Sequence, residues 1–369
     1  MFDRQLTRRD FMKGSAGVGA AAFLAACAPA ASGPSASAKV AAGPLNFLTW
    51  NDHWNKDAIK QAQDLLGITV NITELSDDPD GIAKLQSVGG QLDIVSLDGN
   101  WVPLANENGS IEPFDINSYQ VASQLYPLAR TIDIWTTPAG YLAYPWGWSP
   151  IVIAYNPKFV SPAPEGWDAL IDPKYAKRVV LENEPFDITL WAGLATGAKD
   201  VFDMTDAELA QVKDWLTKLK PNVLKFVAQN DGVISALAKE EAWLGNQNLG
   251  VEGRVLKAGG VVVKSLVARE GTTGFYDGEM TVKAGENKAR VRPYLEFAAQ
   301  AEWCAQNMLD NGRPLFNERA YKLLVDGGHK EAADLVFYNQ PELALKMRLK
   351  GPSTRTDDYL KNFNSVFGA

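Results

Sequence analysis

The chain has 369 residues, which is too many for one ordinary hydrophobic core and about right for two lobes. Its composition is that of a globular protein, with 46% hydrophobic and 22% charged residues. The formal net charge of −8 repels nucleic acid and suits a cationic or neutral partner. The two histidines, His53 and His329, lie far apart and form no metal-binding motif, so we expect neither a metal nor a cofactor.

The N-terminal segment has the features of an export signal. Residues 7–13 read Thr-Arg-Arg-Asp-Phe-Met-Lys, which resembles a twin-arginine signal, and the apolar run that follows is too short to span a bilayer permanently. This run ends at Cys27 in a sequence that resembles a bacterial lipobox. We therefore expect residues 1–26 to be a twin-arginine lipoprotein signal, Cys27 to be lipidated, and residues 27–43 to be a flexible tether to a membrane. The alternatives are an ordinary secretory signal cut near Ala26, or an interior apolar segment.

The first part of the folded chain predicts alternating strands and helices. Strands are predicted at 45–50, 68–73 and 92–97, and helices at 55–66 and 82–88, the first of them ending at Gly67. This order favours a parallel sheet with helices on its faces, in which a ligand binds beyond the carboxyl ends of the strands. Mixed polar and aromatic residues follow two of these strands, at 51–54 and 98–101, as in a ligand-binding mouth.

A second α/β unit is predicted further along the chain. Strands are predicted at 141–144 and 151–155, on either side of a Pro- and Trp-rich segment, and again at 178–181 and 261–266. A capping box at Thr205 and Glu208 begins a helix that runs to about Leu219. One long helix is predicted from about 292 to 309, and its apolar pattern makes Cys304 a buried, inert thiol.

From Leu45 to about Ala320 the sequence resembles the spermidine/putrescine-binding proteins of ABC importers. The matching stretches occur in the family's order: Phe47–Asp52, Leu92–Val95, Tyr144–Trp148, Ala154–Asn156, Gly166–Tyr175, Lys220–Val223 and Glu270–Asp277. The resemblance implies an α/β fold of two lobes, each a mostly parallel sheet flanked by helices, with hinge strands between them. We expect residues 44–152 and 278–320 to form lobe 1 and residues 153–277 and 321–369 to form lobe 2.

The resemblance also implies a set of binding residues. A polyamine needs carboxylates for its ammonium groups and aromatic faces for its methylene chain. The positions that match the family's acidic and aromatic residues are Trp50, Glu184, Asp187, Phe275 and Asp277, while His53 replaces a Tyr and Asp98 falls at a small polar position. Two alternatives stay open, since Asp187 suits a helix N-cap and Asp277 with Gly278 suits a turn.

Two departures from the family pattern bear on the ligand. Asn248 stands where the family has Trp, and Arg313 where it has Tyr. An arginine facing a cation is unfavourable, so Arg313 pairs a ligand carboxylate, points away, or pairs an acidic residue of the wall. If Arg313 faces the cleft, the ligand is expected to be a zwitterion, such as an amino-acid-like or opine-like amine.

Together these features predict a monomeric, lipid-anchored solute-binding protein of an ABC importer, located in the periplasm or on the extracytoplasmic face of the cell membrane. It would carry a small cationic amine to a membrane permease and bind no nucleic acid. An exported hydrolase would need a nucleophile–base pair or a metal constellation, and the sequence offers no Gly-x-Ser-x-Gly motif and no credible Cys/His pair. A binder of ferric iron, thiamine or an anion is a further alternative, but adjacent tyrosines are absent.

Overall fold

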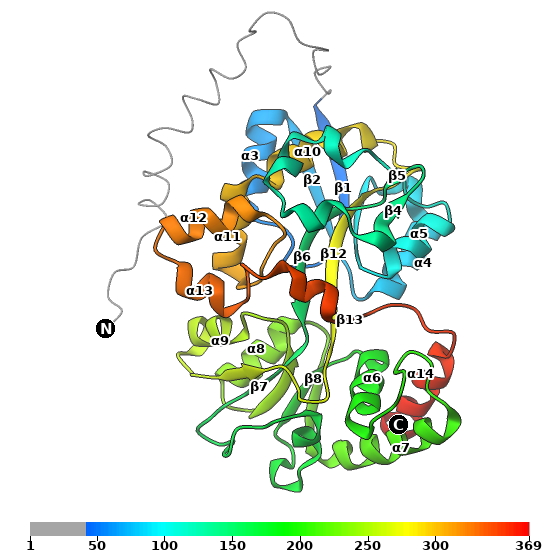
Figure 1. Ribbon diagram of the computed structural model, residues 1–369, viewed down its shortest axis with the longest axis vertical. Helices are drawn as coiled ribbons and strands as arrows, with labels where there is room; N and C mark the ends of the chain where they lie inside the picture. Colours follow the sequence, from blue (N-terminus) through cyan, green and yellow to red (C-terminus); the bar gives the residue numbers. More distant parts are fainter. Residues whose placement is uncertain (1–41, 369) are drawn as a thin grey trace, which may run out of the picture.

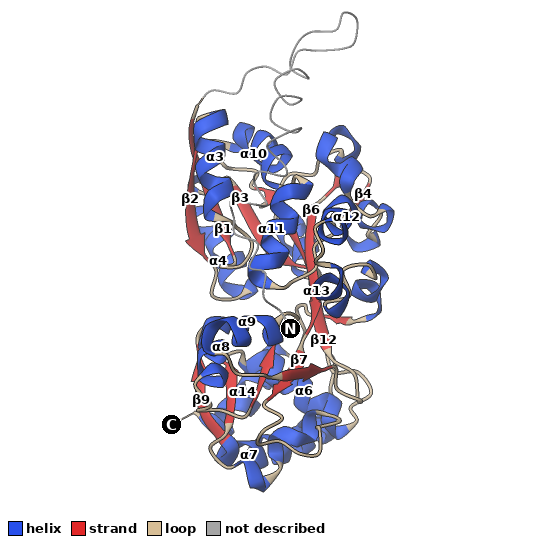
Figure 2. Cartoon of the chain, turned by 90° about the vertical axis from the view of Figure 1, so that its left-hand side faces the viewer, coloured by secondary structure: helices blue, strands red, loops and turns tan. Residues whose placement is uncertain are grey.

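The computed structural model describes residues 42–368, which form two lobes, one above the other in Figure 1. The predicted signal, Cys27 and nearly all of the predicted tether lie outside these described residues. Each lobe contains a mixed sheet covered by helices, and strands and loops connect the two (Figure 2). The expected two-lobe α/β fold is therefore confirmed.

The sheet of lobe 1 has the strand order β13-β12-β3-β1-β2, and β6 also pairs with β12. Its strands are β1 (Gly43–Thr49), β2 (Ile68–Glu74), β3 (Ile94–Asp98), β6 (Tyr144–Pro150), β12 (Thr273–Thr281) and β13 (Arg348–Leu349). Strand β1 is parallel to both β2 and β3, whereas β12 is antiparallel to β3. The carboxyl ends of β1, β2 and β3 therefore meet at one edge of the sheet.

Helices α3 (Lys56–Leu66) and α4 (Asp78–Val88) connect these strands in the predicted β-α-β-α-β order. The Asn55 side chain caps α3 by accepting from the backbone N–H groups of Asp57 and Ala58. The helix ends at Gly67, whose φ of 67° lies in the left-handed region that glycine adopts without steric cost. Local signals in the sequence thus fix both ends of this helix. Further helices of lobe 1 are α5 (Trp101–Glu107), α10 (Val291–Ala298), α11 (Ala301–Asn311), α12 (Glu318–Asp326) and α13 (Lys330–Leu335), and β4 (Thr136–Thr137) and β5 (Gly140–Tyr141) form a short hairpin.

Lobe 2 has a second sheet in the order β11-β7-β10-β8-β9. Its strands are β7 (Val152–Tyr155), β8 (Val179–Glu182), β9 (Val223–Val227), β10 (Leu244–Gln247) and β11 (Lys264–Leu266), and its helices are α6 (Pro185–Thr196), α7 (Asp206–Leu219), α8 (Asn230–Ala238), α9 (Val251–Gly259) and α14 (Thr356–Phe367). Strands β8, β9 and β10 run parallel, while β7 is antiparallel to β10.

A separate hydrophobic core holds α6, α7 and α14 against this sheet. Trp167 and Trp191 are fully buried and stack with ring centroids 4.9 Å apart. The predicted capping box at the start of α7 is present, with Thr205 and Glu208 each accepting from the other's backbone N–H. Helix α6 is buried on nearly all sides, because α7, α14 and the segment Trp167–Ile171 pack around it.

The chain crosses between the lobes three times. Strand β6 leads into β7, β11 leads into β12, and the segment after β13 leads to α14 (Figure 1). The C-terminal part is divided differently from the expected 321–369 block of lobe 2. Helix α12 packs on α11, α13 packs on α12, and β13 pairs with β12, so residues 321–349 lie with lobe 1, and only α14 packs on α6 and α7.

Two local predictions were wrong. The expected single helix over 292–309 is two helices, α10 and α11, separated at Ala299 and Gln300. The Ala299 carbonyl accepts from Asn317 Nδ2, and the Ala301 N–H donates to Gln124, so side chains from elsewhere satisfy the groups exposed at the break. The segment 145–150, expected as a connection between two strands, belongs instead to strand β6, with Pro145 near its start and Pro150 at its end.

Candidate ligand-binding site

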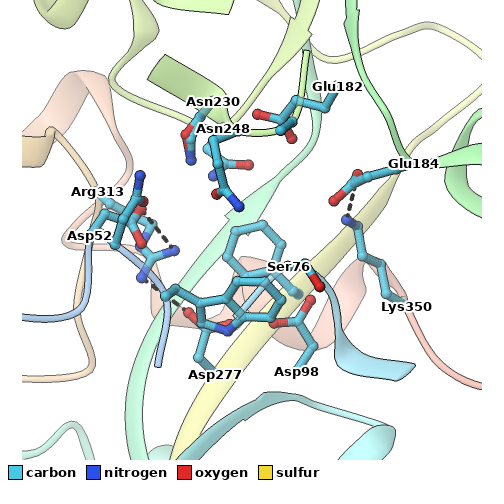
Figure 3. A pocket seen from close by; sticks show the side chains of 15 residues that line it. Asp52, Ser76, Asp98, Glu182, Glu184, Asn230, Asn248, Asp277, Arg313 and Lys350 are labelled. Atoms are coloured by element: carbon cyan, nitrogen blue, oxygen red, sulfur yellow. Dashed lines mark hydrogen bonds and ion pairs between the residues drawn. The ribbon is translucent and has the colours of Figure 1, made fainter. Parts of the chain in front are cut away.

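A pocket lies where strands of both lobes end (Figure 3), with about 520 Å³ of space including its opening to solvent. Lobe 1 contributes residues that follow β1 and β2 and the last residue of β3. Lobe 2 contributes residues at or after the ends of β8, β9 and β10. The lining residues are Trp50, Asn51, Asp52, Ser76, Asp98, Glu182, Glu184, Ala228, Gln229, Asn230, Asn248, Phe275, Asp277, Arg313 and Lys350. The pocket therefore occupies the position that the sheet topology predicts for a ligand.

At one side of the pocket, Arg313 joins two carboxylates. Its Nη1 lies 3.3 Å from Asp52 Oδ2 and its Nη2 lies 3.1 Å from Asp277 Oδ2, and the guanidinium lies 5.4 Å from the centroid of the Phe275 ring. Burial alone would lower the pKa of Arg313, but the Asp52 and Asp277 carboxylates outweigh it and raise that pKa. Arg313 thus faces the pocket as a cation that is already paired with acidic residues of the wall.

His53 lies behind this ion-pair group and does not line the pocket. Its Nε2 is 2.9 Å from Asp277 Oδ2, its Nδ1 is 3.0 Å from Glu279 Oε1, and the residue is only 2% exposed. Burial and the Arg313 charge lower the pKa of His53, which favours the neutral imidazole. The expectation that His53 contacts the ligand was wrong. The imidazole does not line the pocket and instead holds the carboxylate of Asp277, which does.

At the other side of the pocket, Lys350 pairs with Glu184 and Asp187. Its Nζ lies 3.4 Å from Glu184 Oε2 and forms a closer ion pair with Asp187 Oδ2. Asp187 lies in the first turn of α6, which begins at Pro185, so the side chain is an ion-pair partner and not an N-cap. It is buried beneath Lys350 and does not line the pocket, which corrects its expected contact with the ligand.

Asp98 and Glu182 lie on the wall between these two ion-pair groups (Figure 3). Within residues 42–368 neither carboxylate has an ion-pair partner, although Gln247 Nε2 donates to Glu182 over 3.2 Å. Burial, reinforced by the neighbouring Asp277 charge, raises the pKa of Asp98 well above its usual range. Burial and the Glu184 charge raise the pKa of Glu182 to about 8. In both cases the protein compensates the charged carboxylate poorly, so each group keeps its proton above the pH at which it would normally lose it.

Burial and the crowding of acidic groups also raise the pKa of the carboxylates that have ion-pair partners. Burial raises the pKa of Glu184 to about 7, against the opposing effect of Lys350. Burial also raises the pKa of Asp277 to about 6, against the opposing effect of Arg313. Of the residues that line the pocket, five are acidic and two are basic, so a cation entering it would relieve repulsion among the carboxylates.

Several polar atoms on the wall have no hydrogen-bond partner among the described residues. These atoms are Asp277 Oδ1, Asn230 Oδ1 and Trp50 Nε1, all of which are buried. Buried polar groups in proteins are normally satisfied. The two oxygens accept hydrogen bonds, so they fit a ligand that carries N–H donors.

Seven of the nine predicted binding residues line the pocket: Trp50, Asp98, Glu184, Asn248, Phe275, Asp277 and Arg313. Asp277 lies inside strand β12, opposite Asp98, and not in a turn. Sequence reasoning missed Lys350 and Glu182 and did not select Asp52, Ser76 or Asn230. Most of these would have been found by taking every polar residue at or just after the end of a parallel strand.

The described residues contain no group of three or more His, Cys, Asp or Glu side chains able to hold a metal ion. Between residues 42 and 368, no helix combines the length and apolar character needed to cross a bilayer. Cys304 is buried, as expected, and burial raises the pKa of its thiol.

Solved structures with a similar fold include proteins named as transporter components or periplasmic binding proteins. One from Listeria monocytogenes, named as a candidate spermidine/putrescine ABC transporter, is 19% identical with a TM-score of 0.77, over 88% of this chain and 98% of its own. The Tp0655 (TpPotD) lipoprotein of Treponema pallidum is 18% identical with a TM-score of 0.73, over 88% and 99%. MotA from A. tumefaciens B6, in complex with glucopine, is 16% identical with a TM-score of 0.67, over 88% and 99%. No curated protein sequence matches the chain.

The fold and the interlobe pocket thus define a two-lobe binding protein. Residues 56–321 match the sequence profile of the bacterial extracellular solute-binding proteins, and the chain belongs to this family. Residues 5–25 match the twin-arginine translocation signal, which indicates export across the cell membrane. The family and the fold are those of substrate-binding proteins and not of enzymes.

Proposed function

We propose that this protein is the extracytoplasmic receptor of an ABC importer and that it binds a small organic amine between its two lobes. The observation that carries the proposal is the acidic excess of the pocket, where five carboxylates face two cations. Both cations are already paired, and Asp98 and Glu182 remain for a ligand. An amine cation would give them the charge-assisted hydrogen bonds that they lack.

We expect the two lobes to close on the ligand. Closure makes binding tight and gives the permease a closed form of the receptor to recognise. Asp98 belongs to lobe 1 and Glu182 to lobe 2, so an amine held by both is a bridge between the lobes. The rings of Trp50 and Phe275 line the same space and would cover an alkyl chain or a cationic nitrogen. Hinge closure around the ligand then distinguishes the loaded receptor from the empty one.

A polyamine is the first candidate ligand, as the sequence resemblance implies. Isothermal titration of the purified protein with putrescine and spermidine should show saturable binding, and mass spectrometry should recover each amine unchanged. The ligand should also raise the melting temperature, because it binds only the folded state. The absence of binding to every small amine tested would contradict the proposal.

A zwitterionic amine is the second candidate, because Arg313 does line the pocket. Its guanidinium could exchange one of its two carboxylate partners for a ligand carboxylate. The structure of MotA in complex with glucopine supports the choice of an opine-like amine as this second candidate. The test compares putrescine with 4-aminobutyrate in the unaltered protein, in Arg313→Ala and in Arg313→Lys. Tight polyamine binding that Arg313→Ala leaves unchanged would exclude the zwitterion.

The proposal includes a lipid anchor at Cys27 and a tether that lets a monomeric receptor reach its permease. The lipobox-like sequence and the match to an export signal support it. In cells labelled with a fatty acid, the protein should carry the label and sediment with membranes. Cys27→Ser should abolish both properties, and a labelled Cys27→Ser protein would contradict the anchor.

A further inference from the structure

Lys350 comes from a segment far from the rest of the pocket in sequence. It follows the short strand β13, and its backbone N–H donates to the Gly274 carbonyl on β12 over 2.9 Å. The next residue, Gly351, packs so closely on Asn100 that a Cβ there would lie 2.4 Å from the Asn100 Cβ. The segment then continues into lobe 2, where Ser353 Oγ donates to the Phe202 carbonyl. Lys350 is therefore held by its backbone at the crossing between the lobes.

The side chain of Lys350 has the chemistry of the proposed ligand. It is an alkyl chain that ends in a primary ammonium, and its Nζ contacts the two carboxylates, Glu184 and Asp187, that the family resemblance assigns to a ligand cation. The same Nζ lies 5.8 Å from the centroid of the Phe275 ring. The residue is only 9% exposed, so this is not a solvent-screened surface pair.

We infer that Lys350 is a built-in occupant of the cation-binding position formed by Glu184 and Asp187, and that it thereby sets the ligand class. The inference rests on the proposed function. Lys350 supplies the ammonium group for Glu184 and Asp187, so the ammonium group of the ligand goes to Asp98 and Glu182, which line the pocket and have no ion-pair partner among the described residues. The receptor therefore binds one ammonium group of an amine, and a diamine such as putrescine gains little affinity from its second one.

The test compares putrescine with n-butylamine, which has the same four-carbon chain and one ammonium group. In the unaltered protein the two amines should bind within about threefold of each other. In Lys350→Met, putrescine should bind at least about tenfold more tightly than n-butylamine, because its second ammonium can replace Lys350, and a charge-assisted hydrogen bond contributes at least that factor. Lys350→Arg restores the positive charge and should remove the preference for putrescine.

The matched control is Lys264→Met, which deletes a lysine ion-paired with Glu252 over 3.3 Å but 55% exposed. It should leave the ratio of the two affinities unchanged. Lys350→Met leaves the buried Asp187 and the half-buried Glu184 without their cation, which endangers folding. The double variant Lys350→Met/Asp187→Asn removes one of those charges, keeps Glu184 for the ligand, and should show the same preference for putrescine.

The outcomes separate the two proposals. An unaltered protein that already prefers putrescine by tenfold or more would overturn the role of Lys350 and leave the amine receptor standing. Folded Lys350 variants that gain no preference for putrescine would do the same. No amine binding by any of these proteins would overturn the receptor for amines and, with it, the inference.

Discussion

The raised pKa values in the pocket predict that amine binding depends on pH. Burial and the Glu184 charge raise the pKa of Glu182 to about 8 in the ligand-free protein. An alkylammonium stays charged up to about pH 10 and stabilises the carboxylate form of Glu182. Binding therefore releases a proton below pH 8, and the affinity rises with pH until Glu182 is ionised in the free protein as well.

The contribution of Glu182 to this pH dependence can be worked out from its pKa. With a pKa of about 8, Glu182 is ionised in about 1% of the molecules at pH 6 and in about half of them at pH 8. The affinity for n-butylamine should thus rise by up to about fiftyfold between pH 6 and pH 8. Because the side chain is only partly buried, solvent screening reduces this factor, and we expect a rise on the order of tenfold.

Isothermal titration at pH 6, 7 and 8, in buffers of different ionisation enthalpy, measures both the affinity and the number of protons released. Glu182→Gln should make the rise in affinity from pH 6 to pH 8 smaller, because Glu184 and Asp98 still titrate. Glu165→Gln, which changes a carboxylate on the surface that is 76% exposed, should leave the profile as it is. An affinity that is constant from pH 6 to pH 8, with no proton release, would refute the link between burial, charge crowding and ligand binding.

Two further predictions concern packing. Trp191→Ala removes the fully buried ring that stacks on Trp167 and should lower the free energy of unfolding by about 3–5 kcal/mol, measured by urea denaturation; a loss below about 1 kcal/mol would contradict this. Gly250→Ala places a Cβ 2.2 Å from the Gly312 carbonyl oxygen of the other lobe, so it should hold the lobes apart and weaken amine binding by about tenfold or more in isothermal titration. Gly260→Ala is the matched control, because Gly260 also has a positive φ but no atom near its Cβ position; equal losses of binding in both variants would show backbone strain and not the interlobe contact to be the cause.

Local signals predicted the first strands and helices of lobe 1 well. Asn55 and Gly67 are cap residues whose roles depend on a few neighbouring backbone groups, so helix α3 could be located from sequence alone. The break between α10 and α11 could not, because it is stabilised by Gln124 and Asn317, which lie far from Ala299 in sequence. Such long-range hydrogen bonds leave no periodic pattern to read.

The residues of the binding site were likewise predictable only in part. Trp50 and Asp98 were predictable because they follow or end strands whose carboxyl ends must meet in a parallel sheet. Lys350 was not, because nothing in its neighbourhood shows that the C-terminal segment returns between the lobes. His53 could be placed near the site but not behind it, since its partner Glu279 lies on a strand whose register only the structure gives.

Strand β12 combines two tasks in one short stretch of backbone. Eight of its nine residues are buried, and two of these, Phe275 and Asp277, line the pocket. The chain enters this strand directly from lobe 2. A substitution in β12 that alters the choice of solute must also alter the stiffness of the connection between the lobes. Diversification of solute preference in this protein is therefore easier at strand-end positions such as Ser76 and Asn248, which can change without retuning the mechanics of the receptor.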